Sequence, residues 1–295
     1  LPSMAGFDAS IYANMGEMDN KGVDANLEYQ TRIGNKVGLR LFGNLTYSKN
    51  KIVFRDEPAM QYAYQKSEGT RYGEFYGYIA EGYFQSEEEI KKSPRQMREL
   101  APGDIKYKDL NDDGVIDAND QCYLGKSWFP SWSYGMGFNI NYHNFDLALF
   151  FQGVSDVSIM ANGGSIDTGN GDWGASGVGI VPFTGMGLNP SNVITKALDR
   201  WTADNPRADA WYPRMTANAT TNDNNYVNST HWLKDGSYLR LKQASLGYTL
   251  ENKKLMDKGI EYLYFYLSGQ NLLTFSKFKL WDPELGSNGA KYPLS

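Results

Sequence analysis

The chain has 295 residues, a net charge of −5 and 41% hydrophobic residues, which is enough apolar material for an ordered domain. An acidic chain without a concentrated basic face is not expected to bind nucleic acid. The single cysteine, Cys122, excludes an internal disulfide, and one cysteine with two histidines cannot build a structural zinc site. The 21 Tyr, 14 Phe and 31 Gly residues favour an all-β fold.

The first predicted elements are two strands, residues 23–33 and 37–47, in which apolar and polar side chains alternate. Odd positions from Val23 to Ile33 and from Val37 to Tyr47 are mostly apolar, and the intervening positions are mostly polar. Strands of soluble proteins usually have about five or six residues, whereas a tilted membrane strand needs about nine to eleven. The length therefore favours membrane-spanning strands.

Two further hairpins follow the same pattern. Residues 133–142 and 145–152 alternate around a turn at His143 and Asn144, and residues 237–250 pair with residues 261–275. The apolar positions of the third hairpin change parity near Gln243, which predicts a β-bulge. A short helical turn is expected around residues 253–257. Residues 72–84 are a candidate for a seventh strand.

The connections between these strands fall into two length classes. The links at residues 34–35, at residues 143–144 and after Leu250 are short, whereas those at 50–131, at 154–236 and after Ser276 are long. Since successive strands reverse direction, all long connections lie at one end, as in bacterial outer-membrane barrels. We therefore predict an all-β, antiparallel transmembrane β-barrel segment with long extracellular loops. The residues expected to face its lumen are Asp24, Glu28, Arg32, Arg40, Asp146 and Gln152.

All seven tryptophans lie in or beside the long connections. They either pack within the loop layer and anchor the membrane interface, or form a platform for sugar rings, peptide side chains or a partner protein. The candidates for substrate or partner binding are Trp128, Trp132 and Trp173. The same connections contain a capped helical turn at residues 86–92 and a helical spacing at residues 192–204.

Residues 109–120 have the spacing of a calcium-binding loop. Oxygen-bearing side chains surround a glycine, Gly114, that permits the sharp turn, and a backbone carbonyl completes the set. An aspartate at the last position makes the loop resemble dockerin-type loops, and the flanking sequence favours a structural rather than a switching Ca²⁺ ion. A metal-free acidic turn is the alternative. The candidate ligands are Asp109, Asn111, Asp113, Val115, Asp117 and Asp120.

No catalytic constellation is present in the sequence. There is no nucleophile elbow, and His143 and His231 have no evident nucleophile partner. The chain is therefore predicted not to be an enzyme.

Several stretches resemble the SusC/RagA-type TonB-dependent outer-membrane transporters, in particular the C-terminal part of their barrel. They occur in the family's order across nearly the whole chain. The matching stretches are residues 20–23 (NKGV), 43–52 (GNLTYSKNKI), 103–111 (GDIKYKDLN), 238–242 (YLRLK) and 268–275 (SGQNLLTF).

The resemblance implies that residues 1–295 supply part of one barrel domain of about 22 strands, without the plug domain and without the closing strand. It also implies import of oligosaccharides or peptides across a bacterial outer membrane. The implied partners are a SusD-like surface lipoprotein, outer-membrane lipid, and TonB, which would act through an N-terminal region absent here. Two rival hypotheses are a secreted calcium-stabilised β-sandwich that binds glycans and, more weakly, a surface hydrolase.

Overall fold

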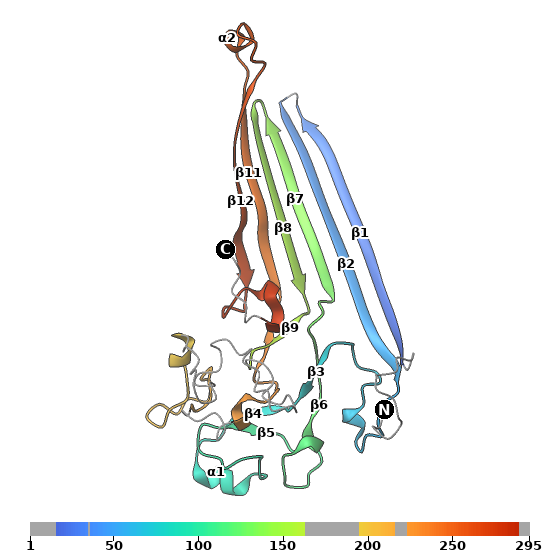
Figure 1. Ribbon diagram of the computed structural model, residues 1–295, viewed down its shortest axis with the longest axis vertical. Helices are drawn as coiled ribbons and strands as arrows, with labels where there is room; N and C mark the ends of the chain where they lie inside the picture. The colour runs from blue at the N-terminus through green and yellow to red at the C-terminus, as the bar shows by residue number, and fades with distance from the viewer. Residues whose placement is uncertain (1–15, 35, 163–194, 216–222, 289–295) are drawn as a thin grey trace, which may run out of the picture.

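The chain forms one open six-stranded antiparallel sheet that rises from a smaller module of loops (Figure 1). The computed structural model describes residues 16–34, 36–162, 195–215 and 223–288. Within these ranges, no helix is long and apolar enough to cross a membrane. The sheet strands, in spatial order, are β1 (Gly16–Ile33), β2 (Val37–Arg55), β7 (Trp132–Tyr142), β8 (Phe145–Ser155), β11 (Tyr238–Leu250) and β12 (Leu263–Ser276).

The register places all predicted apolar positions on one face of the sheet, which we name the outer face. Directly opposite residues point to the same side, and pairs such as Leu45 with Tyr134 and Leu149 with Ala244 continue this face from strand to strand. The polar positions lie on the opposite side, the inner face. Outer-face residues include Val23, Leu27, Tyr29, Ile33, Leu39, Leu41, Phe138, Ile140, Leu147, Leu246, Phe265 and Leu267.

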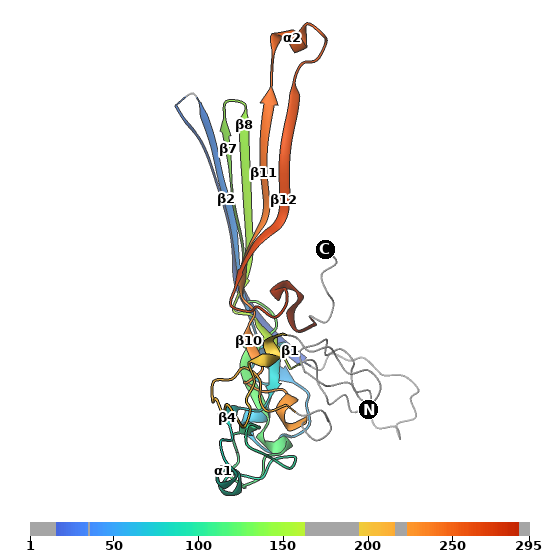
Figure 2. The same cartoon turned by 90° about the vertical axis from the view of Figure 1, so that its left-hand side faces the viewer.

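The apolar outer face is open to the surroundings rather than packed in a core. Leu27 and Leu267 are each 76% exposed, and no second sheet of the described residues covers this face (Figure 2). A β-sandwich buries the apolar side of each sheet against the other. The arrangement is therefore that of a barrel fragment, and it argues against the sandwich hypothesis.

The predicted bulge in β11 is confirmed. The register shifts between Leu241 and Gln243, so that Leu241 lies opposite Phe151 while Gln243 lies opposite Phe150. The extra residue, Lys242, moves the apolar positions from odd to even numbers and keeps them on the outer face. The adjoining part of β12 is also irregular, with Asn271 in the left-handed region at φ 52°.

The long connections have more structure than the sequence predicts. Strand β2 runs on to Arg55, and the predicted seventh strand at 72–84 is wrong, because its two halves pair with different partners. The connecting elements are η2 (Ala63–Gln65), β3 (Glu74–Gly77), β4 (Ala80–Tyr83), α1 (Glu87–Lys92), β5 (Ile105–Tyr107), η3 (Ala118–Asp120), β6 (Cys122–Ser127), β9 (Ser158–Met160), η4 (Thr195–Leu198), η6 (Asp223–Tyr226), β10 (Leu233–Asp235) and η7 (Pro283–Asn288).

Three helical predictions have different outcomes. The capped turn is confirmed as α1, where the Ser86 side chain accepts a hydrogen bond from Glu89 N. The turn in the β11–β12 link is confirmed as α2 (Lys253–Met256). The helix expected over 192–204 is wrong for its described part, where only the short 3₁₀ turn η4 forms. Trp201, which follows this turn, is buried instead in the core of the loops.

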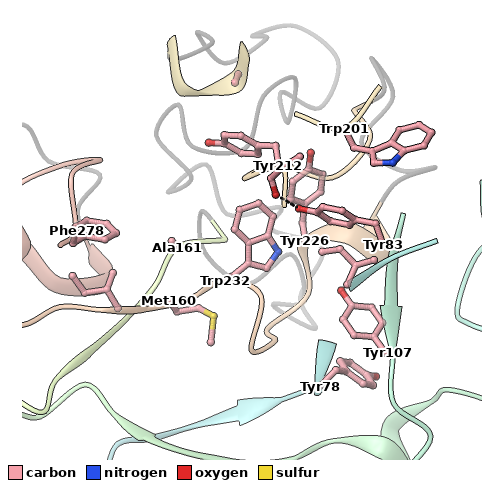
Figure 3. Packing of buried hydrophobic residues seen from close by; sticks show 14 of the residues in the cluster. Tyr78, Tyr83, Tyr107, Met160, Ala161, Trp201, Tyr212, Tyr226, Trp232 and Phe278 are labelled. Carbon is pink, nitrogen blue, oxygen red and sulfur yellow. Dashed lines mark hydrogen bonds between the residues drawn. The ribbon is translucent and has the colours of Figure 1, made fainter. Parts of the chain in front are cut away.

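The three long connections share one aromatic core, and together they form what we name the loop module. Figure 3 shows Tyr83, Tyr212, Tyr226 and Trp232 packed against one another from segments far apart in the sequence. Trp232 is fully buried and donates from Nε1 to the carbonyl of Asn225 at 2.7 Å. All of the largest fully buried hydrophobic side chains of the described residues except Phe84 lie in this core, so the loop module is an ordered body.

A buried polar network ties the first connection to the second. Asn225 is fully buried, and its amide donates to Asp104 Oδ1 at 2.8 Å while its Oδ1 accepts from Ile105 N at 2.8 Å. Arg214 holds the same Asp104 carboxylate through two hydrogen bonds of 2.9 and 3.0 Å. The network compensates the burial of the Asp104 charge, which would otherwise be costly.

We predict that Asn225→Ala loosens the loop module without affecting the sheet. The substitution leaves the buried amide of Ile105 without its acceptor and removes one of the hydrogen bonds to Asp104, which keeps those from Arg214; the loss costs about 2 kcal/mol. Denaturant melting of the full-length protein, followed by tryptophan fluorescence, should show the loop transition at a lower midpoint. The matched control is Asn252→Ala, which removes only the side-chain cap of α2 at the opposite end of the sheet. Equal midpoints for wild type and Asn225→Ala would contradict this role.

Candidate functional site

The inner face carries the six residues predicted to face a lumen. Asp24, Glu28 and Arg32 of β1 lie opposite Thr46, Phe42 and Gly38, and the same side continues through β7 to Asp146 and Gln152. Arg40 Nε lies 2.9 Å from Glu28 Oε1, and both side chains are about half exposed. The Tyr264 hydroxyl donates to Asp146 at 2.9 Å. The prediction that these residues share one polar face is confirmed.

An aromatic stack that was not predicted lies in the middle of this polar face. The rings of Phe42 and Phe150 are nearly parallel, at 11°, with centroids 6.0 Å apart. They lie across Gly137 of β7, where a Cβ atom would come within 2.4 Å of the Phe42 ring. The Arg40 guanidinium lies 4.8 Å from the same ring. The signal in the sequence was two phenylalanines at inner-face positions, beside strand glycines.

A charged cluster also holds the segment after β12 against the sheet. Arg240 of β11 is only 4% exposed, and its guanidinium donates to Glu284 Oε2 at 2.7 Å and to the Asp282 carboxylate. Lys242, the bulge residue, lies 3.3 Å from the same Glu284. Figure 2 shows this segment, which contains η7, beside the lower part of the sheet. The cluster thus fixes η7 on the inner face, near the loop module.

A basic groove lies at the opposite end of the inner face, beside the short turns. Its volume is about 640 Å³. The charged and titratable side chains in its lining are Arg32, Lys36, Arg40 and His143, and Asn139 and Asn141 of β7 add amide groups. Along its length, the inner face therefore offers cationic, amide and aromatic groups to a polar ligand.

The three predicted tryptophans do not form one site. Trp132 belongs to the outer face, where its ring lies 4.4 Å from that of Tyr47, which is the position of an interface anchor. Trp128 is 52% exposed and packs edge-on against Phe129 in the loop module. Trp173 lies outside the described residues. Of these three tryptophans, Trp128 is the one that the structure describes as exposed in the loop module.

The predicted calcium loop is a compact turn closed by its own acidic side chains. Asp109 Oδ2 accepts from Gly114 N at 2.8 Å, and Asp113 Oδ1 accepts from Val115 N at 2.8 Å. Asp120 is fully buried and accepts from the backbone of Leu110 at 2.7 Å and of Asp117 at 2.9 Å. In the same way, Asn111 Oδ1 accepts a hydrogen bond from the backbone N–H of Asp113 at 3.1 Å.

Two observations on this loop point in opposite directions as to whether it can bind a metal ion. Among the described residues, no group of three or more His, Cys, Asp or Glu side chains is gathered closely enough to hold a metal ion. One oxygen, Asp109 Oδ1, is nevertheless buried and has no hydrogen-bond partner. The residues have the right donor chemistry for Ca²⁺, which prefers carboxylate and carbonyl oxygens.

His231 is held neutral within the loop module. Its Nε2 lies 3.2 Å from the carbonyl oxygen of Trp211 and 3.4 Å from the Tyr83 hydroxyl. Burial lowers the pKa of His231 to about 3, and the ammonium group of Lys234 adds to the lowering. The ring packs edge-on against Trp232. The described contacts of His231 are thus with the aromatic core of the loop module.

The open antiparallel sheet with two different faces is consistent with a fragment of a β-barrel, and we compared the chain with known proteins. No protein-family model matches the chain. The chain is 28% identical over 298 residues to TonB-dependent receptor P3 of Formosa agariphila, covering 96% of this chain and 27% of that receptor. It is also 28% identical to TonB-dependent receptor P26 of the same organism, over 98% of this chain and 28% of the receptor.

Solved structures show the same fold. A structure of the RagAB peptide importer in its closed-closed state matches 99% of this chain and 30% of its own chain, with a TM-score of 0.68 and 23% identity. The open-open state of RagAB matches with a TM-score of 0.67 and 22% identity. The chain spans less than a third of the length of these relatives.

The chain is therefore homologous to part of a TonB-dependent receptor, and the resemblance to the SusC/RagA type is confirmed. TonB-dependent receptors are outer-membrane proteins, which confirms the predicted location. They form a transporter family without enzymatic activity, so the prediction that the chain is not an enzyme is also confirmed.

We predict that acid weakens the loop module through His231. The pKa of His231 in the folded protein, about 3, lies below the ordinary histidine value of 6.5, so below about pH 6.5 the unfolded chain binds a proton that the folded chain does not. Stability should therefore be lost as the pH falls from 6.5 towards 3. The loop melting temperature of the full-length protein should drop from pH 7.5 to pH 5, and the drop should be smaller in His231→Gln. Identical pH dependence in both proteins would refute the assignment.

Proposed function

We propose that this chain forms part of the barrel wall and extracellular loops of a TonB-dependent importer of oligosaccharides or peptides. The observation that carries the proposal is the sheet itself, with an apolar exposed outer face and a polar inner face across six strands. In a barrel these faces contact lipid and an aqueous lumen respectively.

The sheet needs further strands to serve this role. Strands β1 and β12 form the two edges of the sheet, and each has one strand neighbour. An unpaired edge within lipid costs several kcal/mol for each open backbone group. We therefore place residues 1–295 in one barrel domain of about 22 strands, the number typical of plugged outer-membrane transporters. Contact with TonB is assigned to the N-terminal region of the receptor, outside this chain.

The inner face suits a polar substrate of either class. The Glu28 and Arg40 pair and the ring of Phe42 offer charge and stacking to a peptide, and the same ring with the amides of Asn139 and Asn141 offers the contacts that sugars use. RagAB is described as a peptide importer, which favours peptide as the first class to examine. A SusD-like lipoprotein is the proposed partner of the loop module, with Trp128 as a contact.

We further propose that residues 109–120 bind a structural Ca²⁺ ion. The free, buried Asp109 Oδ1 supports this assignment, as does Gly114 at φ 82°, which gives the loop its sharp turn. The other proposed ligands are Asn111, Asp113, Asp117 and Asp120, with the carbonyl of Val115. The ion would stiffen the far end of the loop module.

The barrel proposal predicts that a charge on the outer face prevents membrane assembly. Leu149 lies in the middle of β8, where an arginine facing lipid costs about 2–4 kcal/mol. Leu149→Arg should greatly reduce assembly of the full-length receptor, and Leu39→Arg should reduce it less, since Leu39 is closer to the membrane interface. The measurement is heat-modifiable gel migration of outer-membrane fractions.

The matched control is Ala148→Arg, which places the same charge one residue away on the inner face. We expect it to assemble. Normal assembly of Leu149→Arg, or equal failure of both variants, would count against the assignment of the two faces.

The calcium proposal predicts a titratable stabilisation. Adding Ca²⁺ to the metal-stripped full-length receptor should release heat and raise the melting temperature of the loops, and Asp109→Ala and Asp113→Ala should abolish both effects. Asp204→Ala, which removes an exposed carboxylate elsewhere in the loops, is the control and should respond as wild type. If all four proteins behave alike, the loop is a metal-free turn.

A further inference from the structure

The outer face contains an abrupt change from apolar to basic residues at its loop-module end. From Val37 to Tyr47 of β2, every outer-face residue is uncharged, and the same holds from Val23 to Ile33 of β1. Ten residues span about 33 Å along a strand, or about 25 Å of membrane thickness when the strand tilts by about 40°. The uncharged band thus matches the height of a lipid-facing barrel surface.

The next outer-face positions beyond this band are two lysines that face each other. Lys21 of β1 is the direct register partner of Lys49 of β2, one step past the pair of Val23 and Tyr47. Like charges directly opposite on a sheet are destabilising. Both side chains are exposed, and neither forms a hydrogen bond or ion pair with another described residue. Among the described residues, the two lysines therefore form a pair of positive charges without an ion-pair partner.

The following step along the strands does not neutralise this pair. Asp19 lies opposite Lys51, so the two steps together carry three lysines and one aspartate. The side chain of Lys51 lies against the turn at Gly69, since a Cβ atom built on Gly69 would be 3.9 Å from Lys51 Cε. The residue before Gly69 is the exposed Glu68. The acidic neighbours thus lie beside Lys51, towards the loop module, and Lys21 and Lys49 remain the basic pair closest to the apolar band.

The depth of this pair in the membrane identifies its ligand. Lys49 is two residues beyond Tyr47, which stacks on Trp132 at the edge of the apolar band. Two residues advance about 7 Å along the strand, and the headgroup layer begins at the edge of the hydrocarbon and is about 5–8 Å thick. The long connections mark this end as extracellular. A phosphate on an outer-leaflet lipid lies at this height and carries the complementary charge.

We propose that Lys21 and Lys49 form a binding site for the phosphorylated headgroup of an outer-leaflet lipid. One anionic phosphate between the two ammonium groups removes their mutual repulsion and fixes the edge of the sheet at the membrane surface. The lipid chains continue along the apolar outer face below the pair. The site rests on the proposed barrel wall but not on the substrate, the SusD-like partner or the calcium ion.

The test uses the purified full-length receptor in neutral detergent and measures binding of diphosphorylated lipid A by native mass spectrometry. The double variant Lys21→Gln/Lys49→Gln should bind this lipid roughly thirtyfold more weakly. This factor is the combined contribution expected of two lysines that interact with anionic lipid at a membrane surface. Lys21→Arg/Lys49→Arg should retain binding. The matched control is Lys91→Gln/Lys92→Gln, which removes two exposed charges from α1, far from the sheet, and should bind as wild type.

Two further measurements separate the sources of phosphate. Lipid A stripped of its phosphates should bind to wild type as weakly as the intact lipid binds to the glutamine variant, and inorganic phosphate at equal concentration should not compete. Equal binding by wild type and the glutamine variant, equal binding of the stripped lipid, or competition by free phosphate would each overturn the proposal. Normal assembly of the glutamine variant distinguishes these results from a failure of the barrel proposal.

Discussion

The whole structure depends on strand register, because cross-strand partners share a face and each strand alternates with a period of two. A slip of one residue in any strand would carry its apolar side chains to the inner face. The sheet contains one place where the sequence itself slips, at Lys242, and there the bulge restores the faces. The same bulge brings Lys242 and Arg240 to Glu284. One local irregularity thus keeps the outer face apolar and also attaches η7 to the inner face.

The sheet could be predicted from the sequence because its information is local. Alternation gives each strand, the short turns set the neighbours, and a parity change such as that at Gln243 reveals the bulge. The second irregularity, at Asn271, was missed because its left-handed backbone leaves the parity of β12 unchanged. The register beyond Tyr47 was also missed, since the strand continues there without the apolar alternation that defines it.

The loop module was not predictable in the same way. Its core brings together residues with large sequence separations, such as Tyr83, whose hydroxyl donates to the carbonyl of Ala210 at 2.8 Å. Residues 72–84 are rich in aromatic residues that favour strands, but β3 and β4 pair with β6 and β5 in separate sheets. Of the residues with helical spacing near Trp201, Ala197 and Trp201 itself are buried in this core, whereas Leu198 is 76% exposed. Tertiary packing outweighs local preference in such segments.

The candidate site shows the same division. The polar character of the inner face follows from the alternation of polar and apolar residues along each strand. The stack of Phe42 on Phe150 instead depends on Gly137 of the strand between them, because a side chain there would collide with the Phe42 ring. The spacing of the calcium motif identifies oxygen donors but does not determine where they point. In the structure, Asp113 and Asp120 use their oxygens to bond the backbone of the loop. Sequence spacing therefore identifies candidate ligands, and geometry decides whether they converge.

Besides the Arg240 cluster, a second polar junction joins the loop module to the sheet, and it lies at the two central strands. Arg71 of the first connection donates to Asp156, just after β8, at 3.0 Å and to Ser131, just before β7, at 2.7 Å. Ser131 also donates to Asp156. Because β7 and β8 are the two central strands of the sheet, a movement of the first connection acts on both at once. A displacement of Arg71 would therefore be felt by the two central strands of the sheet together.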